Sequence, residues 1–219
     1  MILFYDKNAN IIGDDGKTDG KIHIVTDSKQ AKSIKQQTES GNTSIDLTNV
    51  DKVTLNGGDK TVSGVIASVE AESKDTSPGA GDARLHEEGG HTEVDSNGNV
   101  IAVAWKPGAK KTGTNKASIT PFNGVTKPNA NELADYWHTH TSGEISGIDP
   151  TTGEPTVTSA APGPSGESGD IGYQKKLENA GYNATAIQVD TRGSKTVNFY
   201  TGSGNVTSIK YNAFKKLKQ

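Results

Sequence analysis

The 219-residue chain contains no cysteine, and this absence excludes several kinds of site. Disulfide bonds, thiolate zinc sites and cysteine nucleophiles all need the missing side chain. Any metal ion must therefore be held by imidazole nitrogens and carboxylate oxygens. The first residues, MILFYDKNANIIG, reach Asp6 after a short apolar run and carry no cleavage-site pattern. We therefore expect no signal peptide in this sequence.

Apolar residues and positive charge are also scarce. Hydrophobic residues make up 31% of the chain and aromatic residues 5%, whereas 26 residues are glycine. This composition predicts a modest core and many turns, and no apolar run is long enough to span a membrane. The formal net charge is −3 and the isoelectric point is about 6.0. A broad basic face is therefore not expected, which argues against nucleic acid as a partner.

Local patterns predict an α+β fold. Residues 91–108 read as a hairpin around an Asn-Gly turn, and apolar spacing predicts a helix over 62–75. A second helix is expected over 168–181, with Ser168 as its N-cap, and composition predicts a long loop over 142–166. We expect a mixed β-sheet flanked by a few helices. We expect the chain to divide into two parts: an irregular N-terminal leader or linker segment with one hairpin and one helix (1–80), and the main domain (81–219).

Two histidines lie two residues apart in the stretch YWHTHTSG. On a β-strand, residues i and i+2 project from the same face, so His138 and His140 would point together. Two imidazoles suit a zinc ion, but a catalytic zinc needs a third protein ligand. Two polar residues in a loop remain the alternative. The stretch HEEGGH has one residue too many for the helical HExxH zinc motif, because residues i and i+5 do not share a helix face.

Three motifs occur in the order HEEGGHTEV, WHTHTSG and GPSGESGDIG. Together they resemble the JAMM (JAB-like) zinc metallopeptidases, and in particular the JAB-like toxin domains at the C-termini of bacterial Rhs/YD-repeat polymorphic toxins. The opening stretch YDKNANIIGDDGKTDGKIHIV is similar to the leader that often follows an Rhs core. The resemblance implies a JAMM/MPN-like sheet and a zinc cofactor.

The resemblance also implies a role for individual residues. His138, His140 and Asp170 match the three zinc ligands of the family. Glu87 matches the glutamate that exchanges a proton with the attacking water, and Glu88 is the alternative. These separate roles for the ligands and the glutamate are chemically sound, because zinc lowers the pKa of a bound water molecule and a nearby carboxylate can accept and donate that proton.

The serine motif departs from the family pattern. The family serine, which steadies the tetrahedral intermediate, matches either Ser165 or Ser168, but neither has the family spacing to the aspartate. Thr141 stands where the family has proline. Because the third motif is displaced, Asp149 and Glu167 remain alternative third ligands.

The expected function is a zinc-dependent peptidase or isopeptidase acting as the effector domain of a bacterial polymorphic toxin. Its substrate would be a peptide or an isopeptide-linked protein, and a cognate immunity protein would be a further partner. We expect the domain to be secreted as part of a larger chain. No membrane partner is expected. One alternative is a non-catalytic binding module on the same fold. A metal-dependent nuclease toxin is a further alternative, against which the acidic isoelectric point argues.

Overall fold

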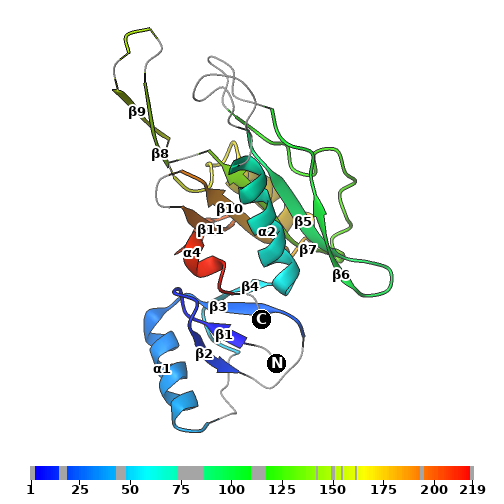
Figure 1. Cartoon of the computed structure of the whole chain (residues 1–219). Coiled ribbons are helices and arrows are strands. Elements are labelled where there is room, and N and C mark those ends of the chain that lie inside the picture. The colour runs from blue at the N-terminus through cyan, green and yellow to red at the C-terminus, as the bar shows by residue number, and fades with distance from the viewer. Residues whose placement is uncertain are drawn as a thin grey trace.

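A computed structural model gives the arrangement of most of the chain. Its described residues fold into four helices and twelve strands, which confirms the α+β class (Figure 1). None of the helices in this part of the chain is long and apolar enough to cross a lipid bilayer. The described residues are 3–14, 19–42, 48–73, 86–109, 117–141, 143–148, 151–153, 155–160, 162–192 and 195–217.

The N-terminal segment is more regular than predicted, because it forms a four-stranded sheet in the order β2-β1-β3-β4. The predicted opening hairpin is the β1–β2 pair, and β3 joins β1 in parallel. A helix, α1 (Ser28–Glu39), follows an Asp27 N-cap that accepts two backbone N–H groups. The strands are β1 (Leu3–Tyr5), β2 (Ile11–Asp14), β3 (Ile22–Val25) and β4 (Lys52–Leu55).

The main sheet has six strands in the order β12-β11-β10-β7-β5-β6. It is mixed, as predicted, because β7 and β10 run parallel while the other neighbours run antiparallel. The predicted hairpin over 91–108 is the β5–β6 pair. The strands are β5 (Gly89–Val94), β6 (Val100–Ala104), β7 (Leu133–His140), β10 (Thr185–Asp190), β11 (Thr196–Thr201) and β12 (Gly204–Lys210).

Helices cover both faces of the main sheet. On one face, α2 (Gly58–Ser73) packs against β5, β6 and β7, and the short α4 (Tyr211–Phe214) joins the same apolar cluster. On the other face lies α3 (Asp170–Asn179), where Gln174 accepts a hydrogen bond from the Tyr136 hydroxyl. The predicted helix over 62–75 is confirmed as α2 up to residue 73. The boundary at residue 80 stays a prediction, because residues 74–85 lie outside the described part.

Alternation along β7 decides which side chains reach which face. Trp137 points to α2, where its indole N–H donates to Ser68 Oγ at 3.0 Å. Tyr136 points the opposite way, to α3. Because successive strand residues alternate, His138 and His140 lie on the same face as Tyr136 and α3.

Two predictions about residues 142–181 were wrong. The segment 142–166 is not all loop, because β8 (Gly143–Ile148) and β9 (Pro155–Ala160) form an antiparallel pair. Its Gly, Pro and Ser content suggested turns, but β9 also contains the β-branched run Thr156-Val157-Thr158, and β8 contains Ile145 and Ile148. Ser168 is not the N-cap of α3; Gly169 occupies that position. Gly181 lies just past the helix end, as predicted, with a φ of +83°.

Asp135 joins the N-terminal part of the chain to the main sheet. Its fully buried carboxylate accepts hydrogen bonds from the backbone N–H groups of Asn56 and Gly57, at 3.0 and 2.7 Å, and from Thr61 Oγ1 at 2.5 Å. These donors belong to the turn from β4 into α2 and to the first turn of that helix. Asp135 therefore fixes the start of α2 against β7.

We expect Asp135→Ala to lower the free energy of unfolding by about 3 kcal/mol, because it leaves buried donors without an acceptor. Urea denaturation followed by circular dichroism measures this change. Glu132→Gln is the matched control, since Glu132 is a partly exposed acid just before the same strand and bonds to nearby Asn129. Equal stability of Asp135→Ala and the wild type would contradict the assigned role.

Candidate metal centre

The side chains of His138, His140 and Asp170 converge at the C-terminal end of β7, an internal strand of the main sheet. The two histidine Nε2 atoms lie 3.0 Å apart. Asp170 Oδ1 lies 3.1 Å from Nε2 of His138, and Oδ2 lies 3.1 Å from Nε2 of His140. Among the described residues this is the one group of three ligand-type side chains that could hold a metal ion.

Backbone geometry explains this convergence. His138 and His140 share a face because they are two residues apart at the end of β7. Asp170 is the first residue of α3, which begins beside that strand end. The dipole of the helix favours a negative charge at this position.

The donor atoms fit a metal ion in both spacing and chemistry. Ligand bonds of about 2.0–2.2 Å in tetrahedral geometry hold neighbouring donor atoms roughly 3.3–3.5 Å apart. The observed separations of 3.0–3.1 Å are within a few tenths of an ångström of this value. Two imidazoles and one carboxylate can therefore hold a divalent cation and leave a coordination position for a further ligand.

The charges of the three side chains support one another. Burial raises the pKa of Asp170, but hydrogen bonds to the two imidazoles and their positive charge outweigh it and hold that pKa far below its usual range. Burial lowers the pKa of His140, and the hydrogen bond with Asp170 and the charge of Glu87 overcome this effect and raise it. Asp170 is therefore ionised at neutral pH, as a metal ligand must be.

Ser165 is tied to Asp170 by three hydrogen bonds. Its hydroxyl and its backbone N–H donate to Asp170 Oδ2 at 2.8 and 2.7 Å, and the N–H of Asp170 donates to Ser165 Oγ at 2.8 Å. Ser165 therefore orients the carboxylate. Ser168 and Glu167 are exposed, and neither belongs to the metal-binding group. Asp149, the other alternative ligand, lies outside the described residues.

Strand register separates the two candidate glutamates. Gly89 pairs with His138, so one step further places Glu88 beside Thr139, whose N–H donates to the Glu88 carbonyl at 2.7 Å. The next step places Glu87 beside His140. Since paired residues share a face, Glu87 lies on the face of the metal centre and Glu88 on the face of α2.

The two glutamates also have different environments. Glu87 is buried, and its Oε2 accepts the backbone N–H of Ile119 at 2.9 Å. Burial raises the pKa of Glu87, although the charges of His138 and His140 oppose the rise. Glu88 is also buried, but its Oε1 lies 2.7 Å from Nε2 of His86, away from the metal centre.

No protein-family model, curated protein or solved structure matches this chain. The likeness to JAMM metallopeptidases therefore stays a prediction from three sequence motifs.

A buried carboxylate beside the site was not predicted. Asp190 ends β10 and pairs in register with His140. Its oxygens accept the N–H of Gly163 at 3.0 and 3.2 Å and the amide of Asn198 at 2.8 Å. Asp190 thereby holds the loop that leads to Asp170. The available signal was the pair Gln188 and Asp190, two polar residues at alternate positions of a strand that also contains Ala186, Ile187 and Val189.

His91 is a second buried polar residue on the face of the metal-binding group, because it lies in β5 opposite Tyr136. It is 1% exposed, and its Nδ1 accepts the indole N–H of Trp105 at 2.9 Å. Because the indole can only donate, the proton of a neutral His91 ring sits on Nε2, which faces Glu93 at 3.1 Å. Trp105 packs over Gly89, where a Cβ atom would lie 2.4 Å from its ring. His91 thus fixes an aromatic wall next to the metal centre.

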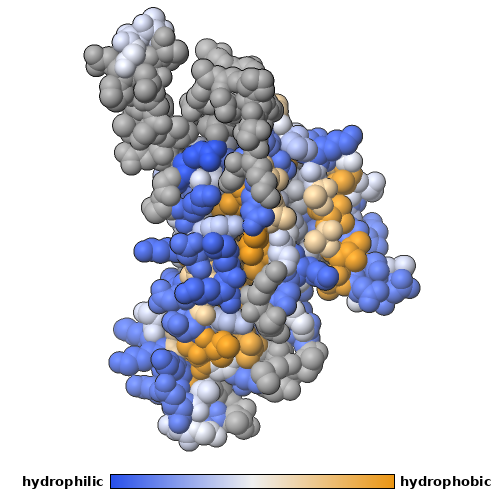
Figure 2. Space-filling model, in the orientation of Figure 1, coloured by the Kyte–Doolittle hydropathy of each residue, from blue (hydrophilic) through white to orange (hydrophobic). Residues whose placement is uncertain are grey.

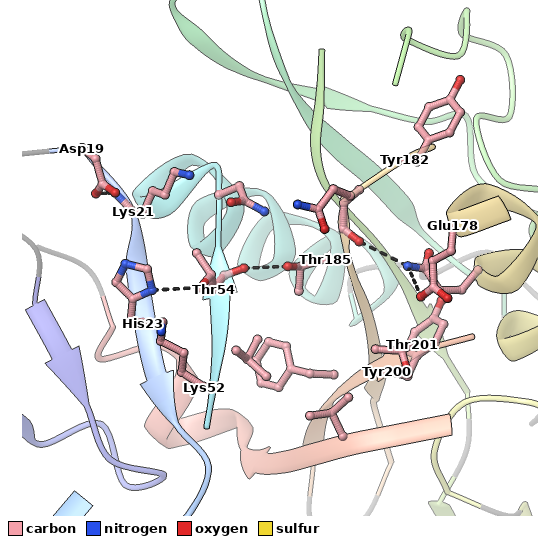
Figure 3. Close-up of a pocket in the computed structure, with 17 residues that line it drawn as sticks. Asp19, Lys21, His23, Lys52, Thr54, Glu178, Tyr182, Thr185, Tyr200 and Thr201 are labelled. Atoms are coloured by element: carbon pink, nitrogen blue, oxygen red, sulfur yellow. Dashed lines mark hydrogen bonds between the residues drawn. The ribbon is translucent and has the colours of Figure 1, made fainter. Parts of the chain in front are cut away.

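A cavity of about 530 Å³ lies elsewhere, between β3 and β4 of the small sheet and β10 to β12 of the main sheet (Figure 3). Thr185 lines it and donates to the carbonyl of Thr54 at 2.6 Å, while Nδ1 of His23 lies 2.8 Å from Thr54 Oγ1. Thr185 begins β10 beside Asp135, whereas His140 ends β7. The cavity and the metal centre are therefore at opposite ends of the strands.

Proposed function

We propose that the chain is a zinc-dependent hydrolase of peptide or isopeptide bonds. The observation that carries this proposal is the placement of Glu87 on the same sheet face as His138, His140 and Asp170. Three ligands, an open position and a buried carboxylate are the parts that metal-assisted hydrolysis requires.

Zinc is the metal that the donor set favours. Imidazole and carboxylate ligands at these separations suit a tetrahedral ion with no redox role, and the chain offers no thiolate for a softer metal. When bound, zinc would lower the pKa of a water molecule and polarise the carbonyl of the scissile bond.

Glu87 is the residue that moves the proton. Its Oε2 is held by the N–H of Ile119, which fixes the carboxylate in one orientation. Oε1 would accept the proton of the attacking water and donate it to the leaving nitrogen as the bond breaks. Burial raises the pKa of Glu87 above its usual value, and this direction favours a carboxyl group that takes up a proton as a base and returns it as an acid.

A module with a structural metal is the second candidate function, and Ser165 favours it. The single hydroxyl proton of Ser165 is given to Asp170 Oδ2, so it cannot also stabilise an oxyanion. In that case the metal would hold the start of α3 against the end of β7, and the protein would not hydrolyse a substrate.

The biological setting rests on the sequence resemblance. A toxin effector of this type would cleave an extended peptide or a tail joined through lysine, and a cognate immunity protein would neutralise it. The acidic isoelectric point supports a protein substrate over nucleic acid.

The test is to load the purified protein with one equivalent of zinc and assay unfolded polypeptides and lysine-linked conjugates by mass spectrometry. Cleavage that a chelator stops and zinc restores is the expected result. Zinc-loaded protein that cleaves neither class overturns the hydrolase proposal, and degradation of DNA or RNA would replace it with a nuclease.

Ser165→Ala is expected to weaken zinc binding about 10–100-fold, as loss of a group that orients a ligand typically does. The Asp170 carboxylate loses one of two Ser165 donors, and the start of α3 loses its acceptor. Competition with a chromophoric chelator measures the dissociation constant. The matched control is Ser168→Ala, three residues away and exposed, which should bind zinc like the wild type. Equal affinities for both variants would contradict the role of Ser165.

A further inference from the structure

Strand β6 is an edge strand of unusual composition. Its sequence is Val-Ile-Ala-Val-Ala, and it pairs only with β5 among the described strands. Ile101 is 38% exposed, and Ala102 and Ala104 are also exposed. An apolar strip marks this side of the molecule in Figure 2, where β6 lies in Figure 1. Edge strands usually carry charges or proline that prevent pairing, and β6 carries neither.

The hydrogen-bond pattern shows which backbone groups face outward. The N–H of Asp95 donates to the carbonyl of Asn99, and the N–H of Trp105 donates to the carbonyl of Gly89. These two bonds mark 95–99 and 89–105 as hydrogen-bonded pairs of the ladder. Because hydrogen-bonded and non-bonded pairs alternate in an antiparallel ladder, the pairs 93–101 and 91–103 between them are also hydrogen-bonded, so residues 101 and 103 bond to β5. The N–H and C=O groups of residues 100, 102 and 104 therefore point away from the sheet.

The open edge has a defined end. The next outward N–H, that of Lys106, donates to the carbonyl of Asn123 at 2.9 Å. The Asn123 side chain donates to the carbonyls of Lys106 and Pro107. The segment around Asn123 thus closes the edge beyond Trp105 and leaves Val100–Ala104 open.

We propose that β6 pairs antiparallel with β6 of a second copy of this chain, in a register centred on Ala102. In this register Ala102 faces Ala102 of the second copy, and Val100 faces Ala104. All outward N–H and C=O groups of the open edge are then satisfied. Ile101 lies opposite Val103 of the second copy on one face, so the exposed aliphatic side chains cover each other.

Charge at the two ends of the strand fits the same arrangement. Asp95 and its turn precede β6, and Lys106 follows it. An antiparallel pair brings the start of one strand beside the end of the other, so opposite charges approach at both ends. The interface is closed by a two-fold axis and does not propagate. No residue of β6 belongs to the metal centre, so this proposal stands apart from the proposed function.

Sedimentation velocity across a range of protein concentrations tests the proposal. The wild type is expected to be dimeric, and Ala102→Lys monomeric, because two lysines would face each other across the axis. Val206→Lys is the matched control, since Val206 is 48% exposed on β12 at the opposite edge of the sheet, and it should stay dimeric. A monomeric wild type at every concentration, or a dimeric Ala102→Lys, overturns the proposal.

The register has a test of its own, because the chain contains no cysteine. Directly opposite residues in a hydrogen-bonded pair have Cα atoms about 5.5 Å apart, within the range a disulfide spans. Ala102→Cys should give a covalent dimer under mild oxidation, and Val206→Cys should not. A dimer that Ala102→Cys fails to cross-link overturns the register, and circular dichroism of each variant checks that the fold is intact.

Discussion

Replacing Glu87 by glutamine is expected to reduce hydrolysis about 10²–10⁴-fold while zinc remains bound. Glutamine keeps the size of the side chain, and its amide can still lie beside the Ile119 N–H, but it cannot accept a proton. Glu87 is not one of the three ligands, so the zinc content should match that of the wild type. Steady-state kinetics and metal analysis on one preparation measure both quantities.

Glu88→Gln is the matched control. Glu88 is the adjacent residue and also buried, but its carboxylate bonds to His86 on the opposite face of the sheet. We expect turnover close to that of the wild type and a loss of stability, because the His86–Glu88 pair is broken. If Glu88→Gln abolished turnover and Glu87→Gln did not, the assignment from strand register would be wrong. If neither variant changed turnover, the metal would not act with a carboxylate base.

Removing one ligand is expected to have the second large effect. His140→Ala and Asp170→Ala should each weaken zinc binding more than about 100-fold, since losing a ligand costs more than losing a group that orients one. Two ligands remain in each variant, too few for a stable tetrahedral site. Competition with a chelator gives the affinity, and the rise in melting temperature on adding zinc gives an independent readout.

His23→Gln is the control for these variants. His23 is also a buried strand histidine, but it lines the separate cavity beside Thr54. It should bind one zinc per chain with wild-type affinity. Zinc that persists in His140→Ala and Asp170→Ala, or that is lost only in His23→Gln, would place the metal elsewhere.

Elements with strong local signals were predicted from the sequence. The Asn-Gly turn predicted the β5–β6 hairpin, and apolar spacing predicted α2. Helix α1 gave no such signal, because only Ala31 and Ile34 of its twelve residues are buried. The β8–β9 pair was missed because its Gly and Pro residues outweighed the Thr and Val alternation.

The candidate metal centre could be predicted only in part. The common face of His138 and His140 follows from the two-residue period of a strand. The approach of Asp170 does not, because it depends on where α3 begins relative to β7, and only the resemblance suggested it. The choice between the two glutamates required the β5–β7 register. Asp190 acts through hydrogen bonds to residues distant in sequence, which no local pattern encodes.

The β8–β9 hairpin has a consequence for how this chain could be altered. It lies between His140 and Asp170 in sequence and, among the described strands, forms a sheet of its own. The residues that flank it are held by β10 and the residue after it: the N–H of Thr191 donates to the carbonyl of His140, and the N–H of Gly163 donates to the Asp190 carboxylate. The ligands are therefore anchored independently of what connects them. A reporter domain or a longer insert could therefore replace the hairpin tip and leave His138, His140 and Asp170 in place.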